Sequence, residues 1–348
     1  MARRILWGSL GLAPVTIFLH YAFHPGGVFE FVISALALIP LAWLIGEATE
    51  QAAHHTGPGI GGFLNATFGN APELIIALFA VNEAKWEVVR GSLSGSVIGN
   101  LLLVLGFSLL FGGRGPIDRE SSMVSLALIA FAVLVLLIPS VPGWEGDPER
   151  DEIARLSVPV SIVLLIAYAV VTWLSLRRHH RLHISDPDAE EVRGWSLGMA
   201  LAVLGVATVV TALVAEILVG SLEVFAEEAN LSEFFVAAVI VAIVGNAAEH
   251  GGAVVVAARG RIKLAAEIAL ASSAQVAVFL IPAVALLSWL IDPLALSFRK
   301  VEIAALAAAT VFTFLLLVQG RSSRLRGALL IGAYVAIAVA FFAVGDRS

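Results

Sequence analysis

The sequence predicts an all-α integral membrane protein with about eleven transmembrane helices, arranged as one extra N-terminal helix followed by two inverted five-helix repeats. Only 14% of the 348 residues are charged and 59% are hydrophobic, whereas a soluble chain carries about 25% charged residues. Apolar runs of about 20 residues recur along the chain, and a polar motif of the first half returns in the second. No soluble core of this length could bury so much apolar surface, so lipid is the solvent for most of it.

The same composition excludes several classes of protein. A net charge of -6, from 21 Lys and Arg against 27 Asp and Glu, offers no basic face for a nucleic acid. The absence of Cys excludes disulfides and thiolate metal sites. We therefore expect the lipid bilayer as the main partner, no cofactor and no nucleic acid, while a homo-oligomer stays open.

Eleven apolar runs bounded by charge, Gly or Pro are predicted to be helices, because backbone groups in lipid must be hydrogen-bonded within their own segment. The first run, residues 1–27, ends in His24-Pro25-Gly26-Gly27, which offers no small-residue cleavage site, so we interpret it as a helix rather than a signal peptide. The runs start near Ile5, Val28, Ile60, Ser92, Met123, Ile153, Trp195, Leu231, Leu264, Val301 and Gly327.

Loop charges predict the orientation of these helices. With a cytoplasmic N-terminus, 14 of the 21 Lys and Arg residues fall in cytoplasmic segments and 7 outside. The C-terminus is then outside, and the long polar segment 177–194 is a cytoplasmic linker between one repeat (28–176) and the other (195–348). Because the chain begins directly with its first span, we expect the inner membrane of a prokaryotic cell.

A five-residue motif marks the repeat. Gly69-Asn70-Ala71-Pro72-Glu73 in the third run returns as Gly245-Asn246-Ala247-Ala248-Glu249 in the eighth, 176 positions later. Because five helices separate the motifs, an odd number, equivalent segments must cross the membrane in opposite directions. Inverted repeats of transporters place the substrate site near the midplane, where the repeats meet. The same offset pairs Glu47 with Glu223, Lys85 with Arg261, and Ser96 with Ser272.

The two motif glutamates, Glu73 and Glu249, are the strongest candidates for a cation site. Charges deep in a span are expensive and mark transport pathways, and an asparagine precedes each glutamate by three residues, on the same helix face. Pro72 removes a helical hydrogen bond and frees carbonyl oxygens. Carboxylate, amide and carbonyl oxygens suit a hard cation such as Ca²⁺; the alternative is a Glu–Asn hydrogen bond that serves packing only. The predicted binding residues are Glu73, Glu249, Asn70, Asn246, Ala71, Gly69 and Gly245.

Three further groups of polar residues could assist this site. Polar stripes on the fourth and ninth runs could complete the coordination or line the path, or could be ordinary helix-packing contacts. Acidic stripes on the second and seventh runs could hand protons or cations to the centre, or could simply be solvated, and His250 could take part in proton coupling or in packing. The residues are Ser92, Ser96, Asn100, Ser272, Gln275, Glu47, Glu50, His54, Glu216, Glu223 and His250.

At these motifs the sequence resembles the calcium/proton antiporters of the CAX family, within the calcium/cation antiporter superfamily. Supporting segments are 95–106 (GSVIGNLLLVLG) and 272–275 (SSAQ), and the resemblance extends from about Val28 to the end. It implies eleven helices, the motif glutamates as the cation site, and proton import that drives Ca²⁺ out of the cytoplasm. The linker departs from the family in being basic before Asp186, and Ser272 stands where the family usually has Gly.

The sequence therefore predicts a secondary antiporter that exchanges Ca²⁺ for H⁺ by alternating access, and not an enzyme. Neither a His-Glu-x-x-His string nor a phosphate-binding Gly-x-x-x-x-Gly-Lys-Ser/Thr loop occurs. The alternatives keep the fold but use Na⁺ as the counter-ion, or carry Mn²⁺ or another divalent cation. A channel is compatible with the composition, but the duplicated site favours alternating access.

Overall fold

The computed structural model describes residues 2–182 and 194–346. Within these ranges, the side chains at 2–4, 57–60, 62, 63, 65, 66, 175–182 and 248–250 lie outside the description. Almost every described element is a helix, and the two short strands, β1 (Gly115–Pro116) and β2 (Arg321–Ser322), pair antiparallel.

The elements of the first half come in the order α1 (Ala2–Ser9), α2 (Leu12–Phe23), α3 (Gly27–Phe68), α4 (Ala71–Asn82), α5 (Trp86–Ile98), η1 (Gly99–Val104), α6 (Leu105–Gly112), α7 (Arg119–Ser140), η2 (Val141–Trp144) and α8 (Asp151–Leu182). Those of the second half are α9 (Leu197–Glu228), α10 (Glu233–Phe235), η3 (Val236–Val241), α11 (Ala242–Gly245), α12 (Ala247–Ala258), α13 (Ile262–Gln275), η4 (Val276–Leu280), α14 (Ile281–Leu287), η5 (Ser288–Leu290), α15 (Lys300–Leu317) and α16 (Arg324–Val344). Segments η1, η3 and η4 are π-helical, and η2 and η5 are 3₁₀ turns.

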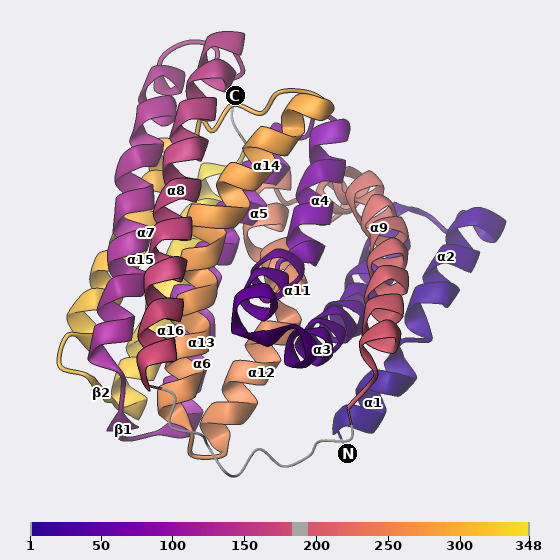
Figure 1. Ribbon diagram of the computed structural model, residues 1–348. Helices are drawn as coiled ribbons and strands as arrows, with labels where there is room; N and C mark the ends of the chain where they lie inside the picture. The colour runs from indigo at the N-terminus through magenta and orange to yellow at the C-terminus, as the bar shows by residue number, and fades with distance from the viewer. Residues whose placement is uncertain (1, 183–193, 347–348) are drawn as a thin grey trace.

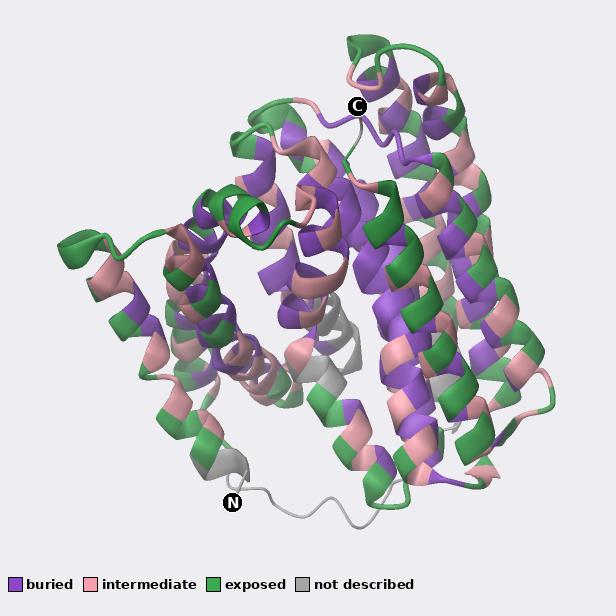
Figure 2. Cartoon of the chain, turned by 180° about the vertical axis from the view of Figure 1, so that it is seen from behind, coloured by how far each residue is buried: buried purple, intermediate pink, exposed green. Residues whose placement is uncertain are grey.

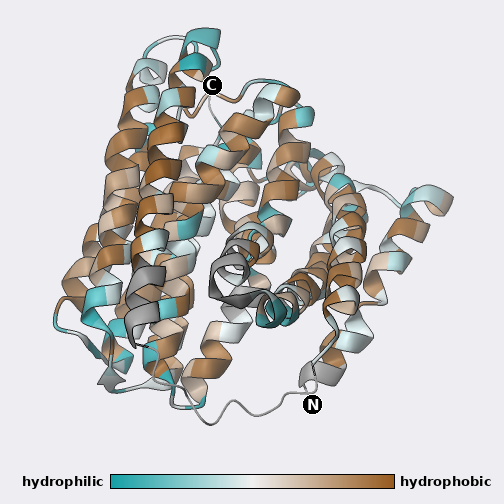
Figure 3. Cartoon of the chain, in the orientation of Figure 1, coloured by the Kyte–Doolittle hydropathy of each residue, from teal (hydrophilic) through white to brown (hydrophobic). Residues whose placement is uncertain are grey.

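The predicted all-α membrane fold is confirmed. Among the described residues, nine helical segments are long and apolar enough to cross a bilayer, and two shorter apolar ones cover Ala71–Asn82 and Glu233–Gly245. Apolar residues make up most of the outer helices and polar residues gather toward the two ends of the bundle (Figure 3), and many large apolar side chains are exposed. This distribution is what a multi-pass membrane protein requires, because lipid replaces water around its middle.

One predicted boundary differs from the structure. We expected a new span to start near Ile60, after the Gly57-Pro58-Gly59 segment, but α3 continues to Phe68 as a helix of 42 residues. A proline removes one helical hydrogen bond and can bend a helix without ending it. The helix is interrupted instead at Gly69 and Asn70, inside the motif.

The last part of the first half also runs further than expected. Helix α8 continues to Leu182, six residues into the segment that we assigned to the cytoplasmic linker. Residues 183–193 of that linker lie outside the described part of the chain.

The two halves reproduce the repeat in three dimensions. Helices α4 and α12 have 12 residues each and start 176 positions apart, and α5 and α13 start with the same offset. The rod of α5, η1 and α6 begins beside the α4–α5 loop and ends at Gly112, where a β-carbon would lie 2.7 Å from Ile262 at the start of α13. The α4–α5 and α12–α13 loops are therefore at opposite ends of one rod, as inverted repeats require.

The helices form two groups with the motif helices between them (Figure 1). Helix α3 packs along α9, beside α1 and α2, and α6, α7, α8 and α13 to α16 form the larger group. Helix α4 contacts both α9 and α5, and α12 contacts α3, α6 and α13. Burial is greatest along α5, η1 and α6, where 83% of the most apolar stretch is buried inside the protein (Figure 2). The motifs therefore lie beside the central rod of the molecule.

Candidate cation site

Both motifs interrupt their helices. Asn70 (φ -102°, ψ 16°) and Asn246 (φ -89°, ψ 5°) have nearly the same non-helical backbone, and α4 and α12 start directly after them. Each motif glutamate is thus the third residue of a new helix, rather than the middle of a continuous one as the i, i+3 prediction assumed. Helix N-termini carry partial positive charge and free N–H groups, which favour a carboxylate there.

The side chain of Glu73 reaches across to the second motif. It is 8% exposed, and a β-carbon on Gly245 would lie 3.1 Å from Glu73 Cγ and 3.6 Å from its Oε1. The glycine of one repeat therefore leaves the room that the glutamate of the other repeat occupies. By backbone, Glu249 and His250 lie on α12, but their side chains lie outside the described residues, so their roles at the cation site stay predictions.

A buried hydrogen-bond network joins the second motif to the central rod. Asn246 Nδ2 donates to Ser96 Oγ at 2.8 Å and to Ala242 O at 3.0 Å. Asn100 Nδ2 donates to Asn246 Oδ1 at 3.2 Å and to Ser272 Oγ at 3.1 Å. These side chains are at most 4% exposed, so the accessory stripes of both halves meet at the motif and fix the direction of its amide.

The first motif makes a weaker link to the second half. Asn70 Nδ2 donates to Gln275 Oε1 at 3.5 Å, the limit of a hydrogen bond. Gln275 ends α13 directly before the π-helical segment η4, and Asn100 lies in the corresponding segment η1. Single π turns are frequent at functional sites. Here η1 contains Asn100, which bonds the second motif, and η4 follows Gln275, which bonds the first.

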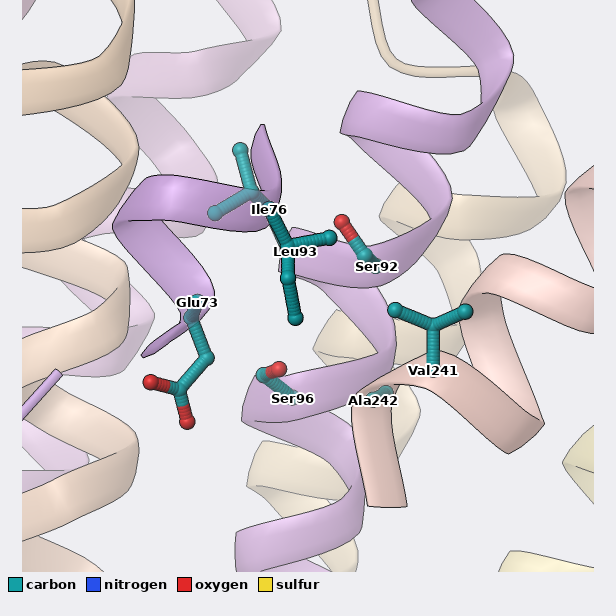
Figure 4. A pocket seen from close by; sticks show the side chains of 7 residues that line it. All are labelled: Glu73, Ile76, Ser92, Leu93, Ser96, Val241 and Ala242. Atoms are coloured by element: carbon teal, nitrogen blue, oxygen red, sulfur yellow. The ribbon is translucent and has the colours of Figure 1, made fainter. Parts of the chain in front are cut away.

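A small cavity lies beside Glu73 (Figure 4). Its volume is about 10 Å³, which is about what one water molecule needs. Figure 4 shows Glu73 approaching from α4 and the hydroxyl groups of Ser92 and Ser96 from α5, with Val241 and Ala242 closing a third side. One carboxylate and two hydroxyl groups line the space, the Ser92 hydroxyl donates to Val89 O at 3.1 Å, and the rest of the lining is apolar. The apolar wall of Ile76, Leu93 and Val241 carried no signal in the sequence, because apolar residues are everywhere in this chain.

The acidic stripes are arranged differently. Glu47 accepts a hydrogen bond from Gln51 at 3.3 Å, while Glu50, His54 and Glu216 are exposed. Glu223 is also exposed and pairs with Lys85 of the first half. A role of these stripes in handing ions to the centre stays a prediction.

A second, larger cavity lies at the end of the molecule where α4 meets α5, and we call it the vestibule. Its volume is about 610 Å³. Lys85 Nζ lies 2.9 Å from Glu223 Oε2 and 3.7 Å from Glu233 Oε2. Burial lowers the pKa of Lys85, but the hydrogen bond to Glu223 and the nearby carboxylates outweigh it and raise this pKa above its usual value. The lining residues are Glu83, Ala84, Lys85, Trp86, Glu87, Arg90, Asp147, Pro148, Glu149, Glu223, Glu233 and Asp346.

Sequence reasoning missed this vestibule. It paired Lys85 with Arg261 by the repeat offset, which says nothing of the contacts that either residue makes. The available signal was the density of acids in the loops on one side of the membrane. Loop positions do not show which loops come together, so only the structure assembles them.

Two broken-helix motifs from inverted repeats, meeting in one buried polar site, define a secondary transporter rather than an enzyme. The profile of the family described as "Sodium/calcium exchanger protein" matches residues 27–177 and again 199–343, so the chain belongs to this family and each repeat is matched separately.

Three comparisons refine this result. The chain is 36% identical over 370 residues to vacuolar cation/proton exchanger 1b of Oryza sativa subsp. japonica, covering 99% of this chain and 80% of the relative. It is 34% identical over 362 residues to the Ca(2+)/H(+) antiporter of Aphanothece halophytica, covering 97% and 96%. The solved structure of native YfkE is similar with a TM-score of 0.81 at 33% identity, covering 96% and 99%. The resemblance to the CAX family is therefore confirmed.

Proposed function

We propose that this protein exchanges Ca²⁺ for H⁺ by alternating access, with Glu73 and Glu249 binding either Ca²⁺ or protons. One observation carries the proposal: Glu73 of the first motif lies against Gly245 of the second, beside the Asn246 network. Relatives that cover nearly the whole chain are named as calcium/proton or cation/proton exchangers, which supports the choice of ions.

The geometry suggests how the site exchanges its ions. Glu73 lies in the first turn of α4, and Ser96 and Asn100 hold the Asn246 amide in one orientation. A divalent cation favours ionised carboxylates, whereas without it protons neutralise them. Protons and Ca²⁺ thus compete for the same oxygens, and a site that has released Ca²⁺ on one side takes up protons before it turns to the other.

The orientation of the chain is part of the proposal. The loop charges favour a cytoplasmic N-terminus and an external C-terminus, in the membrane of a prokaryotic cell. Because Asp346 lines the vestibule, the vestibule then faces outward. A reporter that is active only in the cytoplasm, fused after Ser348, should be silent; an active reporter would contradict this orientation.

The decisive experiment is Ca²⁺ uptake into vesicles that contain the purified protein, driven by an imposed proton gradient. We expect uptake with a proton gradient and none with a Na⁺ gradient, with Mn²⁺ as a competing substrate to rank the divalent cations. Glu73→Gln and Glu249→Gln should each abolish uptake, while Glu228→Gln, at the exposed end of α9, should not change it. Uptake driven by Na⁺ alone would show that Na⁺, and not H⁺, is the counter-ion. Full transport by Glu73→Gln would contradict the proposal that the two glutamates share one site.

A further inference from the structure

The vestibule and the site cavity are separate in this structure. Their described lining residues have no member in common. Glu73, Ile76, Ala80 and Glu83 follow each other at intervals of three and four residues, so they share one face of α4. Glu73 and Ile76 line the site cavity, Glu83 lines the vestibule, and Ala80 between them is 0% exposed. The direct route along α4 is therefore closed at Ala80.

Helix α5 is locked to α10 and η3 on one side of this route. A β-carbon on Gly95 would lie 2.0 Å from Ala238 O, and one on Gly91 would lie 3.0 Å from the Phe234 ring. Gly91 and Gly95 are four residues apart, so the two segments pack closely over about one helical turn. We therefore treat α5, α10 and η3 as one rigid unit.

Helix α9 meets the α4–α5 loop in a looser way. Glu83 Oε1 lies 3.7 Å from the position of a β-carbon on Gly220, which is an ordinary contact without interlocking. An ionic contact is also present: Lys85 pairs with Glu223 on α9 and with Glu233, which starts α10. The ammonium group therefore bridges α9 and the rigid unit. The Lys85 side chain is 12% exposed but that of Glu223 is 58% exposed, so water partly screens the Lys85–Glu223 pair.

We propose that Lys85 is an electrostatic latch that keeps the vestibule side of the transport path closed. This inference rests on the proposed alternating access. When the vestibule side opens, α9 moves away from the α4–α5 loop, the Lys85–Glu223 pair breaks, and Lys85 stays with Glu233 on the rigid unit. The latch thus sets how often the route along Ala80 is open to the vestibule.

The natural absence of cysteine makes the test direct. A single reporter, Ala80→Cys, is placed in the purified protein in nanodiscs, and its rate of labelling by a membrane-impermeant maleimide is measured. Lys85→Gln should raise this rate about two- to fivefold, the range that one partly screened ion pair supplies. Lys85→Glu should raise it further, and Lys85→Glu combined with Glu223→Lys should bring it back toward the parent rate.

Two controls keep the result interpretable. Lys300→Gln removes an exposed lysine that lies over the Trp144 ring and takes no part in the Lys85 pairs, and it should leave labelling unchanged. Asn82→Cys, at an exposed position, should label quickly in every background. An unchanged Ala80→Cys rate in Lys85→Gln, or fast labelling of the charge-swapped pair, would overturn the latch. Because labelling needs no ion flux, it is independent of whether the vesicle assay supports Ca²⁺/H⁺ exchange.

Discussion

The side chain of Glu73 lies against Gly245, although 172 positions separate the two residues in the chain. The contact joins the glutamate of one repeat to the glycine of the other. Gly245 ends α11 with a helical backbone that any residue can adopt. The motif therefore needs glycine here for the space that it leaves to Glu73, and not for its backbone conformation.

Gly245→Ala should therefore weaken ion binding without unfolding the protein. The added methyl group would lie 3.1 Å from Glu73 Cγ, so the glutamate has to shift by a few tenths of an ångström. A misplacement of about 1 Å at a catalytic site can cost about 100-fold in rate, and for this smaller shift we expect about a tenfold loss of apparent Ca²⁺ affinity in vesicle uptake. Gly332→Ala, with no atom within 4 Å of the new β-carbon, is the control. Equal apparent Ca²⁺ affinities of Gly245→Ala and Gly332→Ala would contradict the role of the Glu73–Gly245 contact in ion binding.

Asn100→Ala should destabilise the folded protein. The change removes the donor to Asn246 Oδ1 and Ser272 Oγ, and a buried polar atom left without its partner costs about 1–3 kcal/mol. Ser108→Ala is the matched control, because the Ser108 hydroxyl is fully buried and has no hydrogen-bond partner among the described residues. Thermal unfolding followed by tryptophan fluorescence should show a lower Tm for Asn100→Ala and an unchanged or higher one for Ser108→Ala.

Arg90 should be essential for stability at the vestibule end. It is 1% exposed and donates to both Glu149 oxygens at 2.6 and 3.2 Å, to Glu87 at 3.0 Å and to Ala295 O at 3.3 Å. Removing one partner of a buried pair costs about 3–5 kcal/mol, and these carboxylates are partly exposed, so we expect Arg90→Met to cost about 3 kcal/mol.

The replacement Arg90→Lys separates charge from geometry. Lysine keeps the charge but cannot bind a carboxylate through two parallel hydrogen bonds, so its Tm should lie between those of the parent and Arg90→Met. Arg155→Met, at an exposed position of α8, should leave the Tm unchanged. A Tm of Arg90→Met equal to that of Arg155→Met would disprove the role of this cluster.

Asp118 should make a small pH-dependent contribution at the other end of the molecule. It caps α7 by accepting a hydrogen bond from Ser121 N at 3.1 Å, and Lys263 Nζ lies at 3.0 Å. The hydrogen bond from Ser121, followed by that from Lys263, lowers the pKa of Asp118 below its usual value. Because the folded-state pKa is the lower one, this stabilisation is present above the unfolded pKa of about 4 and is lost as the pH falls through the folded pKa.

The measurement compares Tm values of the parent and Asp118→Ala in nanodiscs as the pH is lowered. Near neutral pH the loss of the cap should cost about 1 kcal/mol, and the difference should shrink once the pH falls below about 4. Asp118→Asn keeps a capping oxygen but has no titrating charge, so the Tm difference between Asp118→Asn and Asp118→Ala should not change with pH. A difference between parent and Asp118→Ala that is constant with pH would contradict the role of the charge.

The sequence by itself determined the membrane class and the repeat, and it indicated Glu73 as a candidate site residue. Length and apolarity of a run decide whether it spans lipid, and both are properties of the local sequence. The repeat offset of 176 positions reappears in the starts of α4 and α12, because duplicated sequence folds into duplicated helices. Asn70 and Glu73 are predicted as site residues from the cost of polar groups in lipid, which is equally local.

Only the tertiary structure decided which residues meet. Ser96 bonds Asn246 from 150 positions away, and Lys85 bonds Glu223 from 138; no local pattern contains these contacts, since they depend on how the two repeats pack. The boundary near Ile60 was missed for a related reason. A proline can end a helix or bend it, and the packing of the neighbouring helices selects between the two. The lipid environment thus fixes the helices one at a time, whereas close packing between the repeats fixes the site.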